Sequence, residues 1–133
     1  MTMKGIAPQF VVPDVVQAAE YYRDVLGFEI LGYFLDPPVF AMVGRDDVEI
    51  QFGKSDGAPP EPNAARRRAG LDAYVWVEDV DSLAEELKAS GARILEGPVT
   101  REYGMREIVI QDLFGFTLAF GSESPAHPAS SNP

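Results

Sequence analysis

The side chains of this chain that could do chemistry are almost all carboxylates, carboxamides and aromatic rings. The 133 residues contain no cysteine, and the one histidine, His127, lies in a C-terminal stretch rich in Ser, Pro and Ala. Without a thiol or a core imidazole, a nucleophile–base pair for covalent catalysis is hard to build. There is no glycine-rich phosphate loop, because Gly97-Pro98 and Gly121-Ser122 stand in the wrong context. Acid–base catalysis by a tyrosine or a carboxylate stays open, as does the binding of a small molecule.

The composition narrows the range of partners. The formal net charge is −10, from 21 acidic and 11 basic residues. Nucleic acids and anionic membrane surfaces are recognised by cationic patches, so neither is expected as a partner. No apolar run approaches the roughly 18 residues of a membrane span, and the N-terminus lacks the basic-then-apolar pattern of a signal peptide. The sequence therefore predicts a cytoplasmic protein.

The elements that must position these side chains occur twice along the chain. The first half predicts a strand at 5–12, a helix at 15–26 and strands at 28–34, 39–43 and 48–53. The second half predicts a strand at 72–77, a helix at 80–90 and strands at 92–97, 105–111 and 116–121. Asp14 and Asp79 are good N-caps for the two helices, and Gly27 and Gly91 are natural helix stops.

Each half is thus a β-α-β-β-β module, and the predicted fold class is α+β. The modules are expected at 5–53 and 70–122, joined by a Pro-rich, polar linker at 54–69, within one domain spanning 1–122. Residues 123–133 are expected to form a disordered tail. Two curved half-sheets that face each other would make a mixed β-sheet cup, and a concave surface of this kind is where a ligand site is expected.

This order of elements resembles the vicinal oxygen chelate superfamily, which includes glyoxalase I, extradiol dioxygenases and the fosfomycin and bleomycin resistance proteins. The matching motifs are Val12-Pro-Asp14, Val25-Leu-Gly-Phe28, Val77-Glu-Asp79-Val and Tyr103-Gly-Met-Arg-Glu107. The segment Asp112-Leu-Phe-Gly115 resembles the closing turn of the family, with leucine in place of proline. The resemblance covers residues 5–121, and it implies the cup and the pairing of two chains in a homodimer.

The resemblance also implies where a metal would bind. In the metal-dependent members the first and last strands of each half supply the ligands, and the matching positions here are Ala7, Gln51, Asp72 and Ala119. The two alanines have no ligand atoms, whereas a catalytic zinc takes three protein ligands and non-haem iron takes two histidines and a carboxylate. A shift of two residues in the alignment would offer Gln9 or Glu49 instead, and a weak all-oxygen site for Mg²⁺ or Mn²⁺ is the remaining alternative. We therefore expect no metal and no other cofactor.

The family register places Phe10 and Val12 beneath the first helix and the corresponding valines beneath the second, so that alternate residues face the cup. The candidate ligand-binding residues are Gln9, Phe40, Glu49, Gln51, Asp72, Tyr74, Trp76, Tyr103 and Met105. Aromatic walls suit flat ligands, and the carboxylates of Glu49 and Asp72 would favour a cationic ligand. A tryptophan in the middle of a strand most often lies in the core. Trp76, however, alternates with the valines that face the helix, which favours a binding role at least as strongly.

Three functions compete on these grounds. In the first, a metal-free protein closest in character to the bleomycin resistance proteins binds and sequesters a small aromatic or antibiotic-like ligand. In the second, the chain is an enzyme, either a glyoxalase-like lyase or isomerase or an extradiol-type dioxygenase with a degenerate metal site. In the third, the cup is filled by its own side chains and the protein acts only through protein contacts. The first is favoured, because metal ligands are missing while the expected cup is aromatic and acidic.

Overall fold

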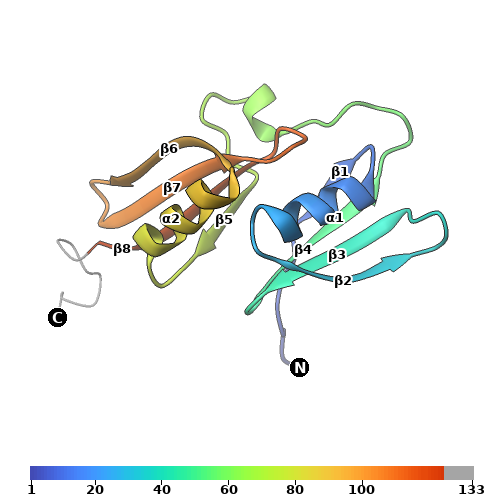
Figure 1. Ribbon diagram of the computed structural model, residues 1–133, viewed down its shortest axis with the longest axis horizontal. Helices are drawn as coiled ribbons and strands as arrows, with labels where there is room; N and C mark the ends of the chain where they lie inside the picture. The colour runs from blue at the N-terminus through green and yellow to red at the C-terminus, as the bar shows by residue number, and fades with distance from the viewer. Residues whose placement is uncertain (125–133) are drawn as a thin grey trace. The chain divides into compact units, whose positions relative to one another are not determined.

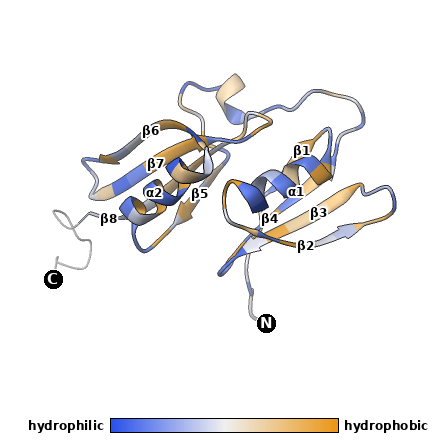
Figure 2. Ribbon diagram, in the orientation of Figure 1, coloured by the Kyte–Doolittle hydropathy of each residue, from blue (hydrophilic) through white to orange (hydrophobic). Residues whose placement is uncertain are grey.

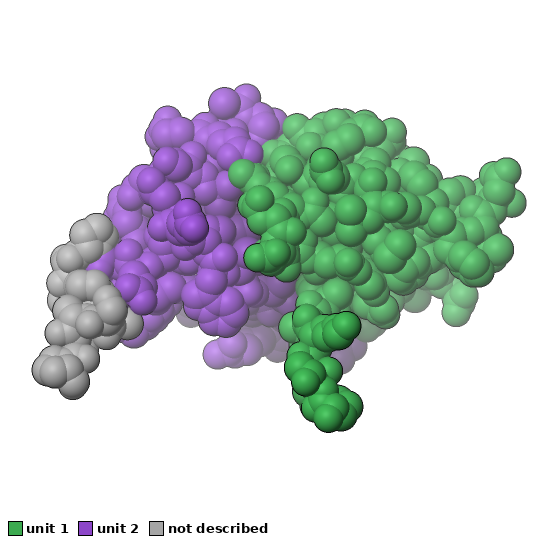
Figure 3. All heavy atoms as spheres, turned by 90° about the horizontal axis from the view of Figure 1, so that it is seen from below, with its two compact units in different colours: residues 1–61 green, residues 62–133 purple. Residues whose placement is uncertain are grey.

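The computed structural model describes residues 1–124, which form two compact units (Figure 3). Unit 1 runs from Met1 to Glu61, and unit 2 begins at Pro62. The boundary falls inside the predicted linker, so each unit corresponds to one predicted module. His127 and most of the predicted tail lie outside the described residues.

Unit 1 is a four-stranded sheet with one helix across a single face (Figure 1). Its elements are β1 Gln9–Val12, α1 Val15–Asp24, β2 Glu29–Phe34, β3 Phe40–Arg45 and β4 Val48–Lys54. The strand order is β1-β4-β3-β2, and the sheet is mixed because β1 runs parallel to β4 while the other pairs are antiparallel. The helix contacts β2, β3 and β4, which leaves the opposite face of the sheet without a helix.

Unit 2 repeats this architecture strand for strand. Its elements are a short 3₁₀ helix η1 Asn63–Ala65, then β5 Ala73–Trp76, α2 Val80–Ser90, β6 Arg93–Thr100, β7 Met105–Gln111 and β8 Thr117–Glu123. The strand order is β5-β8-β7-β6, again with one parallel pair, between β5 and β8. Neither α1 nor α2 has the length and apolar character that a membrane-spanning helix requires.

Both helices begin as their sequences predict, and α2 also ends as predicted, whereas α1 ends at Asp24, two residues before its predicted end. The Asp14 Oδ1 atom accepts hydrogen bonds from the backbone N–H groups of Val16 and Gln17, both at 3.0 Å. Asp79 caps α2 in the same way, and Gly91 ends it in the left-handed conformation, with φ of 83°. The apolar stripe of each helix packs on the sheet of its own unit, and Figure 2 shows hydrophobic residues running along β3 beneath α1.

The α+β class and the two βαβββ modules are confirmed, but some strand ends differ from the prediction. Strand β1 begins at Gln9 rather than at residue 5, since Pro8 has no N–H to donate to a ladder. Strand β6 extends to Thr100, beyond its predicted end at residue 97, because two register shifts on this edge strand accommodate Gly97 and Pro98. Strand β8 runs on to Glu123, which pairs with Met105, so the predicted tail does not begin at 123. The shared cup and the homodimer stay predictions.

Candidate functional site

Each sheet has a helix-covered face and an opposite face, here called the open face. The alternation along β1 separates the two, because Phe10 is 5% exposed beneath α1 while Val11 is 57% exposed. In unit 2, Val75 is buried and its neighbour Trp76 is 75% exposed. The assignment of Phe10, Val12 and Val75 to the helix side is thus confirmed, and the candidate residues alternate with them.

The open face of unit 1 carries a short chain of hydrogen-bonded polar side chains. Gln9 and Gln51 are register partners on β1 and β4, and Gln9 Nε2 donates to Gln51 Oε1 at 2.6 Å. Gln51 Nε2 in turn donates to Glu49 Oε2 at 2.6 Å. Strand parity places Phe40, on β3, on the same face. Four of the predicted residues are therefore on this face, and three of them hold one another in position.

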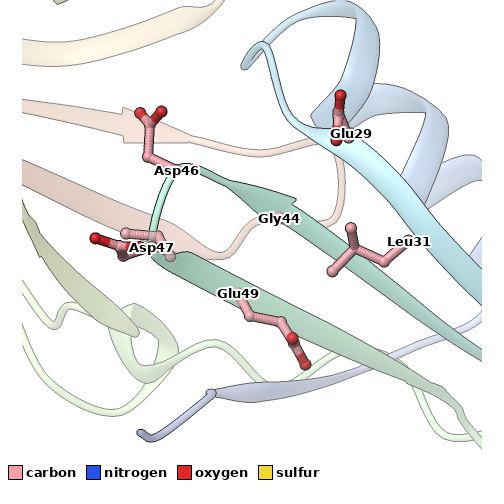
Figure 4. Close-up of a pocket in the computed structure, with 7 residues that line it drawn as sticks. Glu29, Leu31, Gly44, Asp46, Asp47 and Glu49 are labelled. Atoms are coloured by element: carbon pink, nitrogen blue, oxygen red, sulfur yellow. The ribbon is translucent and has the colours of Figure 1, made fainter.

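A small pocket opens beside Glu49, at the end of the β3–β4 hairpin. Its volume is about 200 Å³. The lining residues are Glu29, Leu31, Gly44, Asp46, Asp47, Val48 and Glu49 (Figure 4). Figure 4 shows Asp46, Asp47 and Glu49 pointing in different directions, so their carboxylates do not converge. Within residues 1–124, no group of three or more His, Cys, Asp or Glu side chains is placed to hold a metal ion.

The open face of unit 2 is built around a buried carboxylate, that of Glu107 on β7. Glu107 is 4% exposed, and its carboxylate accepts hydrogen bonds from three donors. Arg101 Nε and the Tyr103 hydroxyl donate to Oε1 at 2.9 and 2.8 Å, and the Tyr74 hydroxyl donates to Oε2 at 2.6 Å. Arg101 also pairs with Glu96. A buried carboxylate is costly unless it is paired and hydrogen-bonded, and here it is both.

Tyr74 reaches Glu107 only because a glycine lies between them. Tyr74 on β5 pairs with Ala119 of β8, whereas Glu107 on β7 pairs with Gly121 of the same strand. The tyrosine ring therefore crosses over β8. A Cβ atom on Gly121 would lie 1.9 Å from the Tyr74 hydroxyl oxygen, which is far inside contact distance. Glycine at this position is thus a condition for the hydrogen bond.

Beside this cluster lies a large aromatic surface that is open to solvent. The rings of Tyr74 and Trp76 have centroids 5.1 Å apart and are tilted by 54°. Trp76 is 75% exposed, and Tyr103 is 68% exposed although its hydroxyl is bonded. Met105 precedes Glu107 by two residues on β7 and shares its face. The exposed indole face of Trp76 beside ordered polar groups is therefore a candidate ligand contact.

The protonation states of the cluster follow from its contacts. Burial alone would raise the pKa of Glu107, but hydrogen bonds from Tyr74, Arg101 and Tyr103 outweigh it and lower the pKa. Burial, followed by the bond to Glu107, raises the pKa of Tyr74 well above its usual range. At neutral pH the carboxylate is therefore ionised and the phenol is a neutral donor. Neither group suits a general acid or base, whose pKa should lie near the working pH.

Asp72 has a different environment from the other candidates. Its Oδ1 and Oδ2 atoms accept hydrogen bonds from the backbone N–H groups of Asn63 and Thr117, both at 2.9 Å. The side chain thus ties the segment around η1 to the start of β8. Each oxygen of the Asp72 carboxylate thus accepts one backbone hydrogen bond, which gives the side chain a structural role.

The metal that the family implies does not fit these residues. Two of the four matching positions, Ala7 and Ala119, have no donor atom. Of the other two, Gln51 is hydrogen-bonded to its neighbours and Asp72 to backbone N–H groups. One carboxamide and one engaged carboxylate fall short of the donor set of a catalytic zinc or non-haem iron.

Sequence reasoning missed the centre of the unit 2 cluster, Glu107 with Arg101, and the role of Gly121. The signal for Glu107 was present in strand parity. Ile108 and Ile110 of β7 are fully buried under α2, so Glu107, which directly precedes Ile108, had to face the other way. Arg101 lies in a loop, where parity gives no direction. The need for Gly121 depends on the position of the Tyr74 ring, which strand parity does not specify.

The fold and these positions define a two-module β-α-β-β-β protein, and comparison with known families gives that class a name. The family model of the Glyoxalase/Bleomycin resistance protein/Dioxygenase superfamily matches residues 6–120. The chain belongs to this superfamily, which confirms the family resemblance.

The individual relatives are distant. The catechol-2,3-dioxygenase of Bacillus subtilis (strain 168) is 33% identical over 92 residues, which is 64% of this chain and 31% of that protein. The chain therefore matches less than a third of that relative's length. The crystal structure of TioX from Micromonospora sp. ML1 has a TM-score of 0.72 at 21% identity, covering 91% of this chain and 99% of TioX. The bleomycin-binding protein of Streptomyces verticillus, crystallised with copper(II)-bleomycin, has a TM-score of 0.64 at 21% identity, covering 90% and 96%. At these identities the two structures show a shared fold.

Replacing Gly121 with alanine should destabilise unit 2. The new methyl group displaces the Tyr74 ring and leaves Glu107 one hydrogen bond short, at an expected loss of about 1–3 kcal/mol in the free energy of unfolding. Gly53→Ala is a matched control, because Gly53 follows Phe52 as Gly121 follows Phe120, but a Cβ atom at Gly53 would meet nothing within 4 Å. We expect the control to change stability by less than about 0.5 kcal/mol. Urea unfolding measures both, and equal losses would contradict the role given to Gly121.

The stability contributed by Glu107 should depend on pH. Its folded pKa lies below the ordinary value of 4.5, so the contribution is present above that value and is lost as the pH falls through the lower folded pKa. The stability difference between the wild type and Glu107→Gln should therefore be largest near neutral pH and shrink as the pH falls below 4.5. Urea unfolding across this range tests it. Glu85→Gln, at an exposed glutamate on α2 that pairs with Lys88, is the control for loss of a carboxylate away from the cluster.

Proposed function

We propose that the protein binds and sequesters a small aromatic, antibiotic-like ligand without a metal, with Trp76 as the main stacking residue. The observation that carries this proposal is the exposed ring of Trp76 packed at 5.1 Å on Tyr74, beside the ordered carboxylate of Glu107. Tryptophan offers the largest aromatic face of any side chain, and stacking on it suits flat ligands. Tyr103 and Met105 flank this surface and are proposed as further ligand contacts.

The polar side chains of unit 1 are proposed as contacts for the polar or charged groups of a ligand. Gln9, Gln51 and Glu49 are held in one hydrogen-bonded chain, which reduces the entropy lost when they bind a partner. Phe40 on the same face would add apolar contact. The carboxylate of Glu49 supports a ligand that carries a positive charge, by charge attraction.

Binding is better supported than catalysis. The donor set at the family's metal positions is incomplete, and neither Glu107 nor Tyr74 has a pKa suited to proton transfer at neutral pH. Action through protein contacts alone is less well supported, because the side chains of unit 2 leave Trp76 largely uncovered. The structural likeness to a bleomycin-binding protein is consistent with sequestration, although that likeness concerns the fold.

The second candidate is an extradiol-type dioxygenase or a related enzyme of the superfamily. It is favoured by one observation, the 33% identity to a catechol-2,3-dioxygenase over 92 residues. The incomplete donor set counts against it. Under this candidate Gln51 and Asp72 would have to supply the metal ligands, and their replacement by alanine would abolish turnover.

Aromatic ligands should quench the fluorescence of Trp76, which is the single tryptophan of the chain. A screen of aromatic antibiotics, including bleomycin, should yield saturable quenching. Trp76→Ala should then weaken binding of the best hit at least about fivefold by calorimetry, since stacking on one large ring contributes about 1–3 kcal/mol. Leu113→Ala, an exposed apolar residue in the β7–β8 turn, is the control and should bind as the wild type does. Unchanged affinity in Trp76→Ala would rule out the stacking role.

Native mass spectrometry of protein purified without chelator should give the mass of a metal-free homodimer. The dimer is proposed from the family resemblance and from exposed apolar side chains such as Val11 and Phe34 on unit 1. A stoichiometric divalent metal would instead move the dioxygenase candidate to first place. A monomer at micromolar concentration would contradict the proposed assembly.

A further inference from the structure

We propose that Glu107 is the polar recognition group of the aromatic site, and that its ligand is a planar aromatic compound carrying a ring hydroxyl or ring amine that replaces the Tyr103 hydroxyl at Oε1. This inference rests on the proposed function and adds a ligand class to it. It also assigns Tyr103 a role, that of an occupant of the ligand position when no ligand is bound.

Of the three donors to Glu107, Tyr103 is the one that is free to leave. Tyr74 lies over Gly121, in contact with that strand, and Arg101 is held by both Glu107 and Glu96. The Tyr103 side chain is 68% exposed and its ring has no ring partner within residues 1–124. A rotation of this one side chain would uncover Oε1.

The backbone beneath Tyr103 does not need to move. The N–H of Arg101 donates to the Met105 carbonyl at 2.7 Å, and the N–H of Gly104 donates to the Arg101 carbonyl at 3.1 Å. Gly104 has φ of 88°, which lets the chain turn within these bonds. The turn is thus closed by its own backbone, and the exchange concerns a side chain alone.

The chemistry of Glu107 dictates what can take the place of Tyr103. A buried, ionised carboxylate that loses a donor suffers the desolvation cost of an unmet hydrogen bond. A ligand that stacks on Trp76 and Tyr74 and displaces Tyr103 must therefore return an O–H or N–H to Oε1. Because Arg101 already supplies a positive charge, a neutral donor suffices. An aromatic compound of the same shape without a donor leaves Oε1 with Arg101 as its one donor, a hydrogen bond short, and binds more weakly.

The experiment compares two probes that differ in this donor, 2-naphthol and 2-methoxynaphthalene. The single tryptophan gives one indole N–H resonance in a ¹H–¹⁵N spectrum, which reports binding at Trp76 directly. We expect 2-naphthol to bind at least about tenfold more tightly, the difference that a hydrogen bond to a charged group makes. Equal affinities would overturn this inference and leave the proposed function standing. If neither probe shifts the resonance, both fail.

Two variants separate recognition by Glu107 from a merely structural role. Glu107→Gln should reduce the preference for 2-naphthol to less than about threefold. Tyr103→Phe removes the competing hydroxyl, so both probes should bind more tightly while the preference for 2-naphthol persists. A Tyr103 that only stabilises the turn would leave both affinities unchanged, and that result would contradict the exchange. Because Tyr103→Phe alters an exposed side chain, it tests the inference even if Glu107→Gln fails to fold.

Matched controls use the same substitutions away from the site. Tyr33→Phe removes a hydroxyl on the helix side of the unit 1 sheet, where Tyr33 interacts electrostatically with Glu20 and Arg23. Glu85→Gln removes an exposed carboxylate on α2. Both controls should bind the two probes as the wild type does.

Discussion

One helix per module can cover only one face of a four-stranded sheet, and the rest of the molecule follows from that constraint. The covered face carries the large aliphatic and aromatic residues of every strand, because these side chains must pack against the helix. The open face of each sheet is released from packing against a helix, so its residues are free to be polar, aromatic or small. The chemistry of both units is found on these open faces, in the Gln9–Gln51–Glu49 chain and around Glu107.

The two modules use equivalent positions differently. Gln9 and Tyr74 stand at matching places on the first strands, and Gln51 and Ala119 are their register partners on the last strands. In unit 1 two carboxamides meet across the strands. In unit 2 a small partner and a glycine let an aromatic ring pass over the strand to a carboxylate beyond it. A duplicated scaffold thus holds two unlike surfaces because the helix-covered cores, not the open faces, maintain the fold.

The duplicated pattern was enough to predict the module order, both helix caps and the burial of Phe10 and Val12, since each depends on local chemistry or on period. The ends of β6 were not predictable in this way, because Gly97-Pro98 signals a loop unless register shifts on an edge strand absorb it. The exposure of Trp76 followed from parity. Its ring contact with Tyr74 and the hydrogen bond from Tyr74 to Glu107 did not follow from parity. A bond that reaches from β5 over β8 to β7 depends on the position of the Tyr74 ring and on the glycine beneath it.

The backbone closure of the turn at Arg101–Met105 has a consequence for rates. Rotations of exposed side chains take picoseconds to nanoseconds, whereas loop opening is slower by orders of magnitude. If the proposed exchange at Tyr103 takes place, a site guarded by one tyrosine on a closed turn would impose no conformational delay on an arriving molecule, and encounter would be limited by diffusion and orientation. Differences among ligands would then be expressed in their residence times, which is the property that matters for a protein that holds a compound rather than transforms it.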